Sequence, residues 1–176
     1  MPPKISKRAF DQTPDRDLCD WLNGCIRTSF EETGACSANA SELEAIMTLP
    51  RGLRAVYSLC VFNGEVLNGG FQQYFTNSNG LLASAAVEAC RLVGAHKHAE
   101  ILDKGFRLWE AARKLWESAK GDEDQEERTW EIFETEIGPE FDTLDPAIDA
   151  LRDAELLFDL LTDWLRRHPD ECVTEP

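Results

Sequence analysis

Carboxylates are the side chains with the greatest capacity for chemistry in this sequence of 176 residues, and they crowd its last third. Paired carboxylates can act as general acid and base, but that role requires a pocket and shifted pKa values, which spacing alone does not establish. A row of ionised carboxylates on a solvated helix instead creates a negative field that attracts basic protein surfaces. The candidates for such partner contacts are Asp145, Asp149, Asp153, Glu155, Asp159, Asp163, Glu131 and Glu134.

Five of these carboxylates fall within one polar half of a helix at about 100° per residue: Asp145, Asp149, Glu155, Asp159 and Asp163. Steps of four residues place neighbouring carboxylates ~6 Å apart along a helix axis. Phosphates of one DNA strand advance about 3.4 Å each along the duplex, so the row is compatible with a groove that binds DNA. Many solvated helices share this spacing, and the row equally suits an acidic face that only keeps a small protein in solution.

Metal-binding and redox chemistry have weak support in the sequence. His96 and His98 diverge at the start of a helix, and no nearby residue completes a ligand set. The six cysteines are irregularly spaced without a Cys-x-x-Cys pair, and several lie among apolar residues, where a free thiol behaves as a small hydrophobe. We therefore expect no metal, no cofactor and no disulfide framework.

Recognisable catalytic motifs are absent from the sequence. It contains no phosphate-binding glycine loop, no nucleophile elbow and no histidine triad. We predict on this basis that the protein is not an enzyme. An alternative places a catalytic site at the polar corner between Asn68 and Asn77, which would require a deep pocket with convergent side chains.

The formal net charge of −15 belongs to one end of the chain. Residues 1–121 carry 14 acidic and 14 basic side chains, whereas residues 122–176 carry 19 acidic and 4 basic ones. A field concentrated in this way repels nucleic acid and anionic membranes, and it attracts cationic proteins over long range. The expected partner is a protein with a basic surface, without direct binding to nucleic acid or membrane.

Apolar residues recur at helical spacing along the chain, and no segment shows sustained strand alternation. The pattern predicts an all-α, single-domain bundle of about seven or eight helices with no sheet. We expect a flexible basic N-terminus over residues 1–14, a helical domain over 15–168 with its acidic part at 122–168, and a C-terminal tail over 169–176. The polar segment 34–41 predicts a loop. Because no signal peptide and no stretch of roughly 20 apolar residues is evident, we expect a cytoplasmic location.

Glycine and proline set the expected ends of the later helices. Gly94 ends an apolar stripe, a long amphipathic helix closes near Gly121, and Gly138-Pro139 stops a shorter helix. The last helix is expected to start at Asp145-Pro146, with the aspartate as its cap, and to run to about Arg167.

Two leucines depart from a plain solvated face on this last helix. Leu156 and Leu160 project into its acidic half. They either widen the buried stripe or contact a second copy of the chain.

The densest cluster of unusual residues lies between Phe62 and Gly80. Asn68-Gly69-Gly70 predicts a turn or a helix break, because glycine adopts backbone angles that other residues avoid. The aromatic residues that follow form one face at helical spacing. Free amides at such a helix start could hold an anion or a carboxylate such as Glu65. The alternative is a tight corner between two core helices, in which amide side chains satisfy backbone groups.

The pattern E-x-x-N-G-G-F-x-Q-Y-F-x-N-S-x-G, read from Glu65 to Gly80, resembles the motif of the bacterial DNA-mimic protein family. Gly94-Ala95, Leu144-Asp145 and His168-Pro169 add weaker similarities, so the resemblance covers about residues 45–170. It implies an all-helical homodimer that occupies the DNA-binding surface of a transcription regulator. The motif residues, which we expect to be structural, are Glu65, Asn68, Gly69, Gly70, Phe71, Gln73, Tyr74, Phe75, Asn77 and Gly80.

Two functions therefore compete as explanations of the acidic end. The resemblance favours a DNA mimic that binds a basic DNA-binding protein. The alternative is an immunity or adaptor protein that blocks a toxin or effector, such as a nuclease, without imitating DNA in detail. The carboxylates that would make either contact lie outside the matching motif, so the resemblance assigns none of them a role.

Overall fold

A computed structural model describes residues 2–33, 40–78 and 80–175. These residues form helices, turns and short connections without a strand, and a single isolated β-bridge joins Ser6 to Glu175. The predicted all-helical fold without a sheet is confirmed. Of the loop expected at residues 34–41, residues 34–39 lie outside the described residues, and the prediction is wrong for residues 40–41, which begin α3. None of the helices in the described ranges has the length and apolar composition that crossing a membrane requires.

The helices follow one another with short connections. Their bounds are α1 Lys7–Gln12, α2 Asp15–Thr33, α3 Ala40–Met47, α4 Arg51–Ser78, α5 Ala83–Val93, α6 His96–Ala119, α7 Glu123–Ile132, the π-helix η1 Phe133–Ile137, α8 Gly138–Asp142, α9 Leu144–Asp149, α10 Leu157–Arg167 and the 3-10 helix η2 Pro169–Glu171. Among the α-helices of the described residues, α1, α8 and α9 have six residues or fewer. The other seven correspond to the expected seven or eight.

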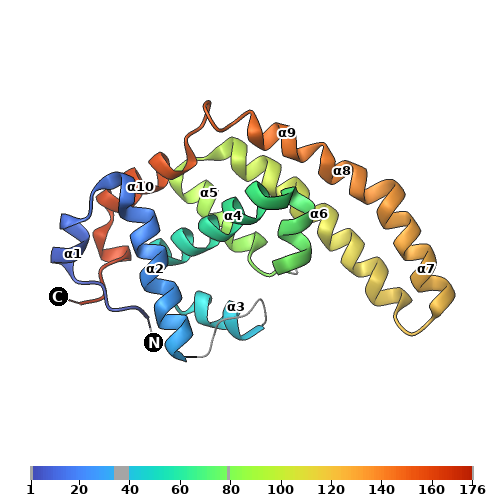
Figure 1. Ribbon diagram of the computed structural model, residues 1–176, viewed down its shortest axis with the longest axis horizontal. Helices are drawn as coiled ribbons and strands as arrows, with labels where there is room; N and C mark the ends of the chain where they lie inside the picture. Colours follow the sequence, from blue (N-terminus) through green and yellow to red (C-terminus); the bar gives the residue numbers. More distant parts are fainter. Residues whose placement is uncertain (1, 34–39, 79, 176) are drawn as a thin grey trace.

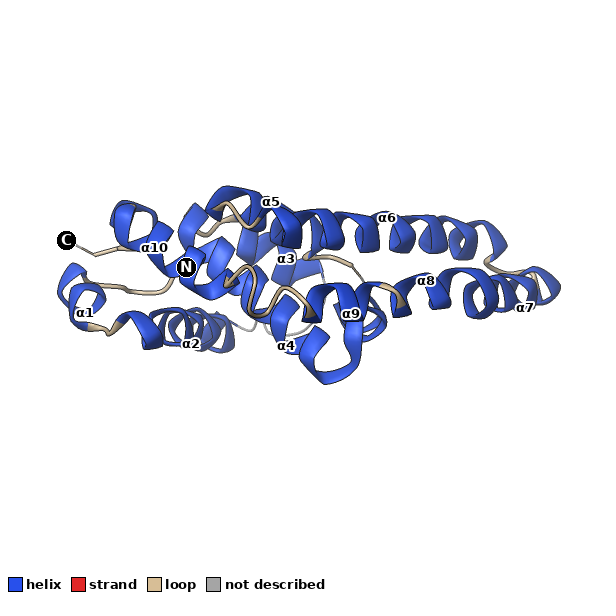
Figure 2. Ribbon diagram, turned by 90° about the horizontal axis from the view of Figure 1, so that it is seen from above, coloured by secondary structure: helices blue, strands red, loops and turns tan. Residues whose placement is uncertain are grey.

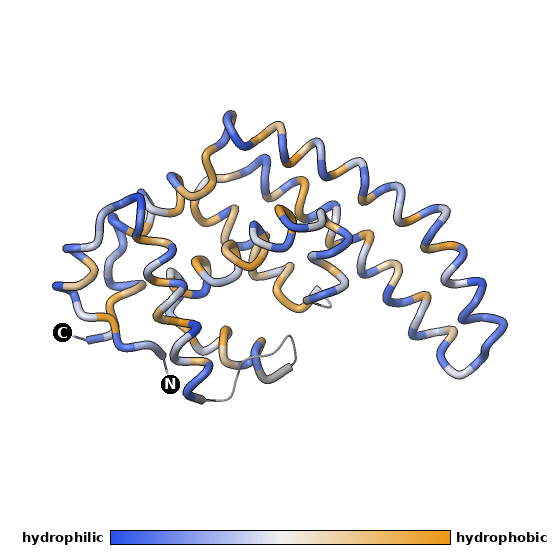
Figure 3. Tube along the Cα trace, viewed as in Figure 1, coloured by the Kyte–Doolittle hydropathy of each residue, from blue (hydrophilic) through white to orange (hydrophobic). Residues whose placement is uncertain are grey.

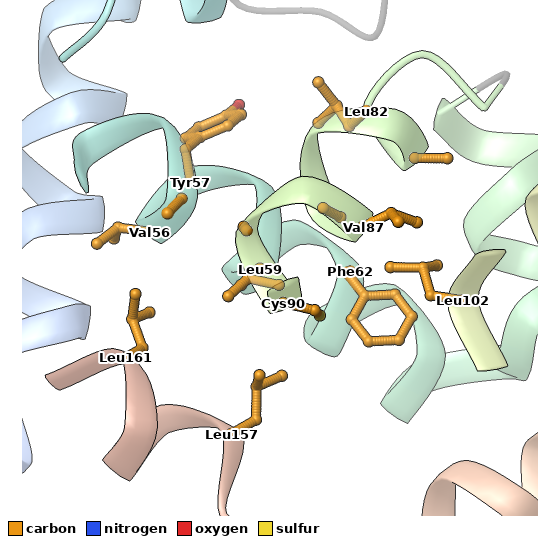
Figure 4. Close-up of a cluster of buried hydrophobic side chains, with 14 of the residues drawn as sticks. Val56, Tyr57, Leu59, Phe62, Leu82, Val87, Cys90, Leu102, Leu157 and Leu161 are labelled. Carbon is orange, nitrogen blue, oxygen red and sulfur yellow. The ribbon is translucent and has the colours of Figure 1, made fainter. Parts of the chain in front are cut away.

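The core lies where α4 and α5 pack together at the centre of the molecule, with α2 and α10 beside them (Figures 1 and 4). Val56 and Phe62 of α4, Cys90 of α5, and Leu157 and Leu161 of α10 are all buried in one cluster. Burial of such side chains, at roughly 25 cal/mol per Å² of apolar surface, is the main favourable term of folding. Gly94 ends α5 with a φ of 85°, as its sequence position predicts.

A long helical hairpin, which we call the arm, projects from this body. It consists of α6 and the returning path α7–η1–α8–α9, and both views show the two halves side by side (Figures 1 and 2). The chain reverses at Gly121, whose φ of 89° suits glycine. Hydrophilic residues concentrate at the arm's tip, whereas apolar residues gather where the helices pack (Figure 3). The acidic third of the sequence therefore starts at the far end of the arm and returns to the body.

The two ends of the chain meet at the opposite end of the molecule (Figure 1). The N-terminal segment, expected to be flexible, contains α1, and its Ile5 and Phe10 are buried. The amide of Ile5 donates to Oγ1 of Thr174 at 2.8 Å, and the guanidinium of Arg166 donates to the carbonyl of Phe10 at 2.7 Å. These contacts join the N-terminal segment to the C-terminal tail and to α10.

The expected helix stop at Gly138-Pro139 is wrong. The helix continues through the π-helix η1, in which the amide of Gly138 donates to the carbonyl of Phe133, five residues earlier. This wider turn brings Pro139 to the first turn of α8, where the missing proline N–H costs no hydrogen bond. The arm therefore passes a proline without reversing direction.

The expected continuous last helix is also wrong. It divides into α9 and α10, and residues 150–156 form turns between them. No glycine or proline lies in this connection. The break follows instead from a tertiary contact, because the side chain of Glu155 is bound to the first turn of α6.

Candidate protein-binding surface

The carboxylates predicted to contact a partner do not form one row, because the helix that would align them is broken. The structure distributes them over five segments: Glu131 in α7, Glu134 in η1, Asp145 and Asp149 in α9, Asp153 and Glu155 in the connection, and Asp159 and Asp163 in α10. Their surroundings divide them into two carboxylates that hold the fold and others that face solvent.

Glu155 holds the start of α6 in place. Its carboxylate accepts hydrogen bonds from the backbone amides of His98 at 3.0 Å and Lys97 at 3.4 Å, and it lies 2.7 Å from Nδ1 of His98. The Glu155 side chain is 14% exposed and that of His98 is 7% exposed. Burial alone would raise the pKa of Glu155, but hydrogen bonds from the His98 ring and from both amides outweigh it and lower the pKa. An ionised Glu155 is thus part of the scaffold.

Asp145 plays a similar part at the break in α4. Gly69 and Gly70 leave the helical conformation, with a φ of 73° at Gly70, and the helix restarts at Phe71. The amide of Phe71 donates to Oδ1 of Asp145 at 2.8 Å. An N-terminal amide of a helix is a favourable site for a carboxylate. Asp145, which lies in α9, therefore accepts a hydrogen bond that the restarted part of α4 would otherwise lack.

The remaining carboxylates after α8 face solvent. Asp149 forms an ion pair with Arg152 at 2.7 Å, and both side chains are more than half exposed. Asp153, Asp159 and Asp163 are exposed and form no salt bridge within the described ranges. Such charges remain hydrated and are available to a cationic surface.

The arm carries the highest density of unpaired negative charge. Between residues 122 and 142 the chain has ten carboxylates and one cation, Arg128. Asp122 caps α7 through the amide of Gln125, and Glu126 accepts the amide of Gly121. Seven further carboxylates are exposed and form no salt bridge to the residues that the structure describes: Glu123, Asp124, Glu127, Glu131, Glu134, Glu136 and Asp142. Five of these seven were absent from the predicted candidates, although the acidic run at 122–127 indicates the arm in the sequence.

The α6 half of the arm is electrically balanced. Arg107 pairs with Asp103 at 2.7 Å and Arg113 pairs with Glu117 at 2.6 Å, each within one helical turn. One pair crosses the hairpin, from Lys104 to Glu140 at 3.2 Å. The excess negative charge of the arm therefore lies on its α7–η1–α8 half.

A ladder of aromatic rings joins the two halves of the arm to the body. The ring of Trp116 lies 5.6 Å from Trp109 and 4.9 Å from Phe133, and Phe133 lies 5.8 Å from Trp130. Trp109 in turn stacks on Phe75 of the motif at 5.9 Å. Such pairs stabilise by about 0.5–1.5 kcal/mol each beyond their burial. The ladder fixes the direction in which the acidic helix projects.

The motif residues contact one another around the break in α4. Gln73 and Asn77 donate side-chain amide hydrogen bonds to Oε2 of Glu65 at 2.9 and 2.8 Å, bridging the two parts of the helix. Phe71, Tyr74 and Phe75 are fully buried. Gly80 has a φ of 65° and faces the ring of Trp109, while Asn68, Gly69 and Asn77 are exposed. The corner thus contains the contacts of a packed helix junction.

An apolar groove lies beside the connection between α9 and α10. It has a volume of about 210 Å³, and its walls include Phe62, Val66, Leu67, Leu156 and Phe158. Leu67 is 51% exposed and Leu156 is 50% exposed, whereas Leu160 packs partly against the core. Leu156 is therefore available to a partner, and Leu160 widens the buried stripe.

The histidines differ in their surroundings, with His96 exposed and His98 buried against Glu155. Over residues 2–33, 40–78 and 80–175, no group of three potential ligands is placed to hold a metal ion. Burial raises the pKa of the Cys60, Cys90 and Cys172 thiols to about 12, so these thiols stay protonated at neutral pH.

Comparison with known proteins finds one family. The sequence model of a family described as DMP19-like protein matches residues 47–168 of this chain. The match includes the motif Glu65–Gly80, the arm and α10. It confirms the resemblance based on that motif. No curated protein and no solved structure matches the chain.

Proposed function

The chain belongs to the DMP19-like protein family, and we propose that it is a DNA mimic whose acidic surface occupies the DNA-binding site of a basic protein. Regulation of transcription follows where that protein is a transcription regulator. The observation that carries the proposal is the arm's row of exposed, unpaired carboxylates on α7 and η1.

The dimensions of the arm support this proposal. The stretch from Glu123 to Asp142 spans about 30 Å at ~1.5 Å per residue. One DNA strand displays roughly nine phosphates over the same distance. The ten carboxylates between residues 122 and 142 give a comparable charge on a helix held rigid by the aromatic ladder. Asp153, Asp159 and Asp163 extend the acidic surface onto the body.

The test is capture of basic proteins by the immobilised chain, with salt and duplex DNA as competitors. A mimic should lose its captured protein steeply as sodium chloride is raised and should release it to duplex DNA, because both compete for the same cations. Capture that withstands salt and duplex would contradict mimicry. It would favour the immunity or adaptor function instead.

Charge-neutral variants locate the contact. The triple change Glu127→Gln, Glu131→Gln and Glu134→Gln should weaken binding at least tenfold, because it removes three exposed carboxylates of the arm. The matched control is Glu31→Gln, Glu32→Gln and Glu100→Gln, which removes the same charge from exposed positions on α2 and α6. Equal weakening by both triples would show that net charge alone, without a defined surface, attracts the partner.

The same protein is expected to act as a homodimer, and the apolar groove beside Leu156 is the surface proposed to pair. Exposed Leu67 and Leu156 flank it, and two copies of the patch related by a two-fold axis would cover each other. Gel filtration of a variant with Leu67→Glu and Leu156→Glu should show half the wild-type mass. An unchanged elution volume would contradict pairing through this patch.

A further inference from the structure

A second groove lies between the first turns of α4 and one side of α5 from Ala85 to Leu92. Its volume is about 320 Å³. Three of the eight residues that line it are arginines, which is unusual in so acidic a protein. The lining consists of Arg51, Arg54, Ala55, Ala85, Glu88, Ala89, Arg91 and Leu92. Its Arg51 contacts Glu171 of η2 and Trp164 of α10.

The floor of this groove is apolar. Ala55, Ala85 and Ala89 are each at most 6% exposed, and Leu92 is half-buried. Small side chains on both helices let α4 and α5 approach closely and leave the hollow above them. A hydrocarbon body of a few carbon atoms placed there would remove this apolar surface from water.

The walls carry a local positive charge within a strongly negative protein. Arg54 forms no ion pair with the described residues, and its Nη1 lies 3.8 Å from Sδ of Met47. Arg51 lies 3.7 Å from a carboxylate oxygen of Glu171 and 5.5 Å from the centre of the Trp164 ring. Arg91 approaches Asp103 at 3.6 Å, but Asp103 is engaged at 2.7 Å by Arg107.

Guanidinium groups of this kind recognise oxyanions. Their planar fork matches a carboxylate through paired hydrogen bonds, and the neighbouring apolar floor strengthens the interaction by excluding water. Glu88 is the one carboxylate of the wall, and it disfavours a ligand with two negative charges. From this arrangement we propose that the groove binds a monoanionic carboxylate with a short apolar body.

This site stands independently of the acidic surface. Its arginines lie on α4 and α5, whereas the carboxylates proposed to meet a DNA-binding protein lie on α7, η1 and α10. Loss of carboxylate binding would therefore leave DNA mimicry untouched, and the reverse holds as well.

The test is a titration of the full chain with sodium octanoate. Calorimetry measures the affinity, and nitrogen-15 NMR spectra show which backbone amides shift. Octanoate should saturate one site and shift the amides of Ala55 and Ala89. Octan-1-ol, which lacks the charge, should bind at least tenfold more weakly. Octyl phosphate, which is dianionic at pH 8, should also bind more weakly because of Glu88.

Two arginine variants and one control complete the test. Arg54→Gln and, independently, Arg91→Gln should each weaken octanoate binding at least fivefold. Arg113→Gln removes the same charge from an exposed position on the arm and should change the affinity less than twofold. The proposal is overturned if octanoate fails to saturate by 10 mM, if octan-1-ol binds equally well, or if Arg113→Gln has the effect of the other two. Tighter binding of octyl phosphate would overturn the assignment to a monoanion.

Discussion

Individual carboxylates of the acidic end differ in what they contact, even though they look alike in the sequence. Glu155 and Asp145 accept backbone amides at the starts of α6 and of the second half of α4. Glu131 and Glu134 face solvent on the arm. A carboxylate that accepts amides from a helix start stabilises the fold, whereas a solvated one contributes little until a partner arrives. Neutralising the two kinds should therefore have different effects.

Glu155→Gln is expected to lower the free energy of unfolding by about 1 kcal/mol at pH 7, because a neutral amide accepts weaker hydrogen bonds from His98 and Lys97. The folded state lowers the pKa of Glu155, so its stabilisation is present above the unfolded pKa and is lost as the pH falls through the folded pKa. Urea unfolding at pH 7 and at pH 3 should show the difference between wild type and variant shrinking in acid.

The matched control is Asp153→Asn, which removes the same charge two residues earlier at an exposed position. It should change stability by less than about 0.5 kcal/mol at either pH. A pH-independent difference for Glu155→Gln would mean that ionised Glu155 does not support α6.

At the scale of elements, interruptions of the helices determine the shape. α4 breaks at Gly69-Gly70 and restarts under Asp145, the arm passes Pro139 through η1, and α9 separates from α10 where Glu155 turns inward. None of these interruptions requires a long loop. The elements on either side are held by packing, as for the aromatic ladder between Trp109 and Phe133.

Gly70→Ala should destabilise the protein by about 1–3 kcal/mol, because φ of 73° with ψ of −172° is a region that only glycine adopts readily. An added Cβ would also lie 2.3 Å from Oδ2 of Asp145. Gly64→Ala is the control in the same helix, since a Cβ there meets nothing within 4 Å. It should raise stability by about 0.5–1 kcal/mol. Thermal and urea unfolding would test the opposite signs, and two changes of the same sign would contradict this account of the break.

Phe133→Ala should loosen the arm, because Phe133 is 3% exposed and lies between Trp116 and Trp130. Loss of a buried phenylalanine costs about 3–5 kcal/mol. Hydrogen exchange should become faster for the amides of residues 123–137 than for those of α5. Trp130→Ala, at a side chain that is 54% exposed, should have a much smaller effect. Equal acceleration across the arm and the body would show that the arm does not open separately.

At the scale of the whole molecule, the negative charge is densest on the α7–η1–α8 half of the arm. The net charge of −15 opposes folding through self-repulsion, and this repulsion is concentrated where the carboxylates lack partners. The free protein is thus least favourable electrostatically in the region proposed to bind a cationic surface.

Raising sodium chloride from 20 to 300 mM should increase the melting temperature of the free protein by about 2–4 °C, equivalent to roughly 1 kcal/mol, because salt screens the repulsion between carboxylates. The triple variant Glu127→Gln, Glu131→Gln and Glu134→Gln should gain less from salt than the wild type. Scanning calorimetry of both proteins measures the difference. A larger gain for the variant would contradict repulsion within the arm.

The sequence predicts the features that local patterns control. Helical periodicity reveals the all-helical fold, Gly94 and Gly121 end the helices expected of them, and Asn68-Gly69-Gly70 indicates the break in α4. The turn before α10 was missed, because its local sequence favours helix and the contact from Glu155 to α6 overrides that preference. Helical spacing alone groups Glu155 with the solvated carboxylates, because spacing carries no information about its distant contact with α6.

The amide contacts of Asp145 and Glu155 have a consequence for how the acidic end can be handled. It is not a detachable tail, because its own side chains complete α4 and α6, and Cys172 beyond it packs against Gly52. A synthetic peptide of residues 122–168 would lose the amides that orient these two carboxylates and the rings that straighten the arm. Deleting the same stretch would leave two helix starts without acceptors. Transfer of the acidic surface to another protein would therefore have to include α4 and α6 as well.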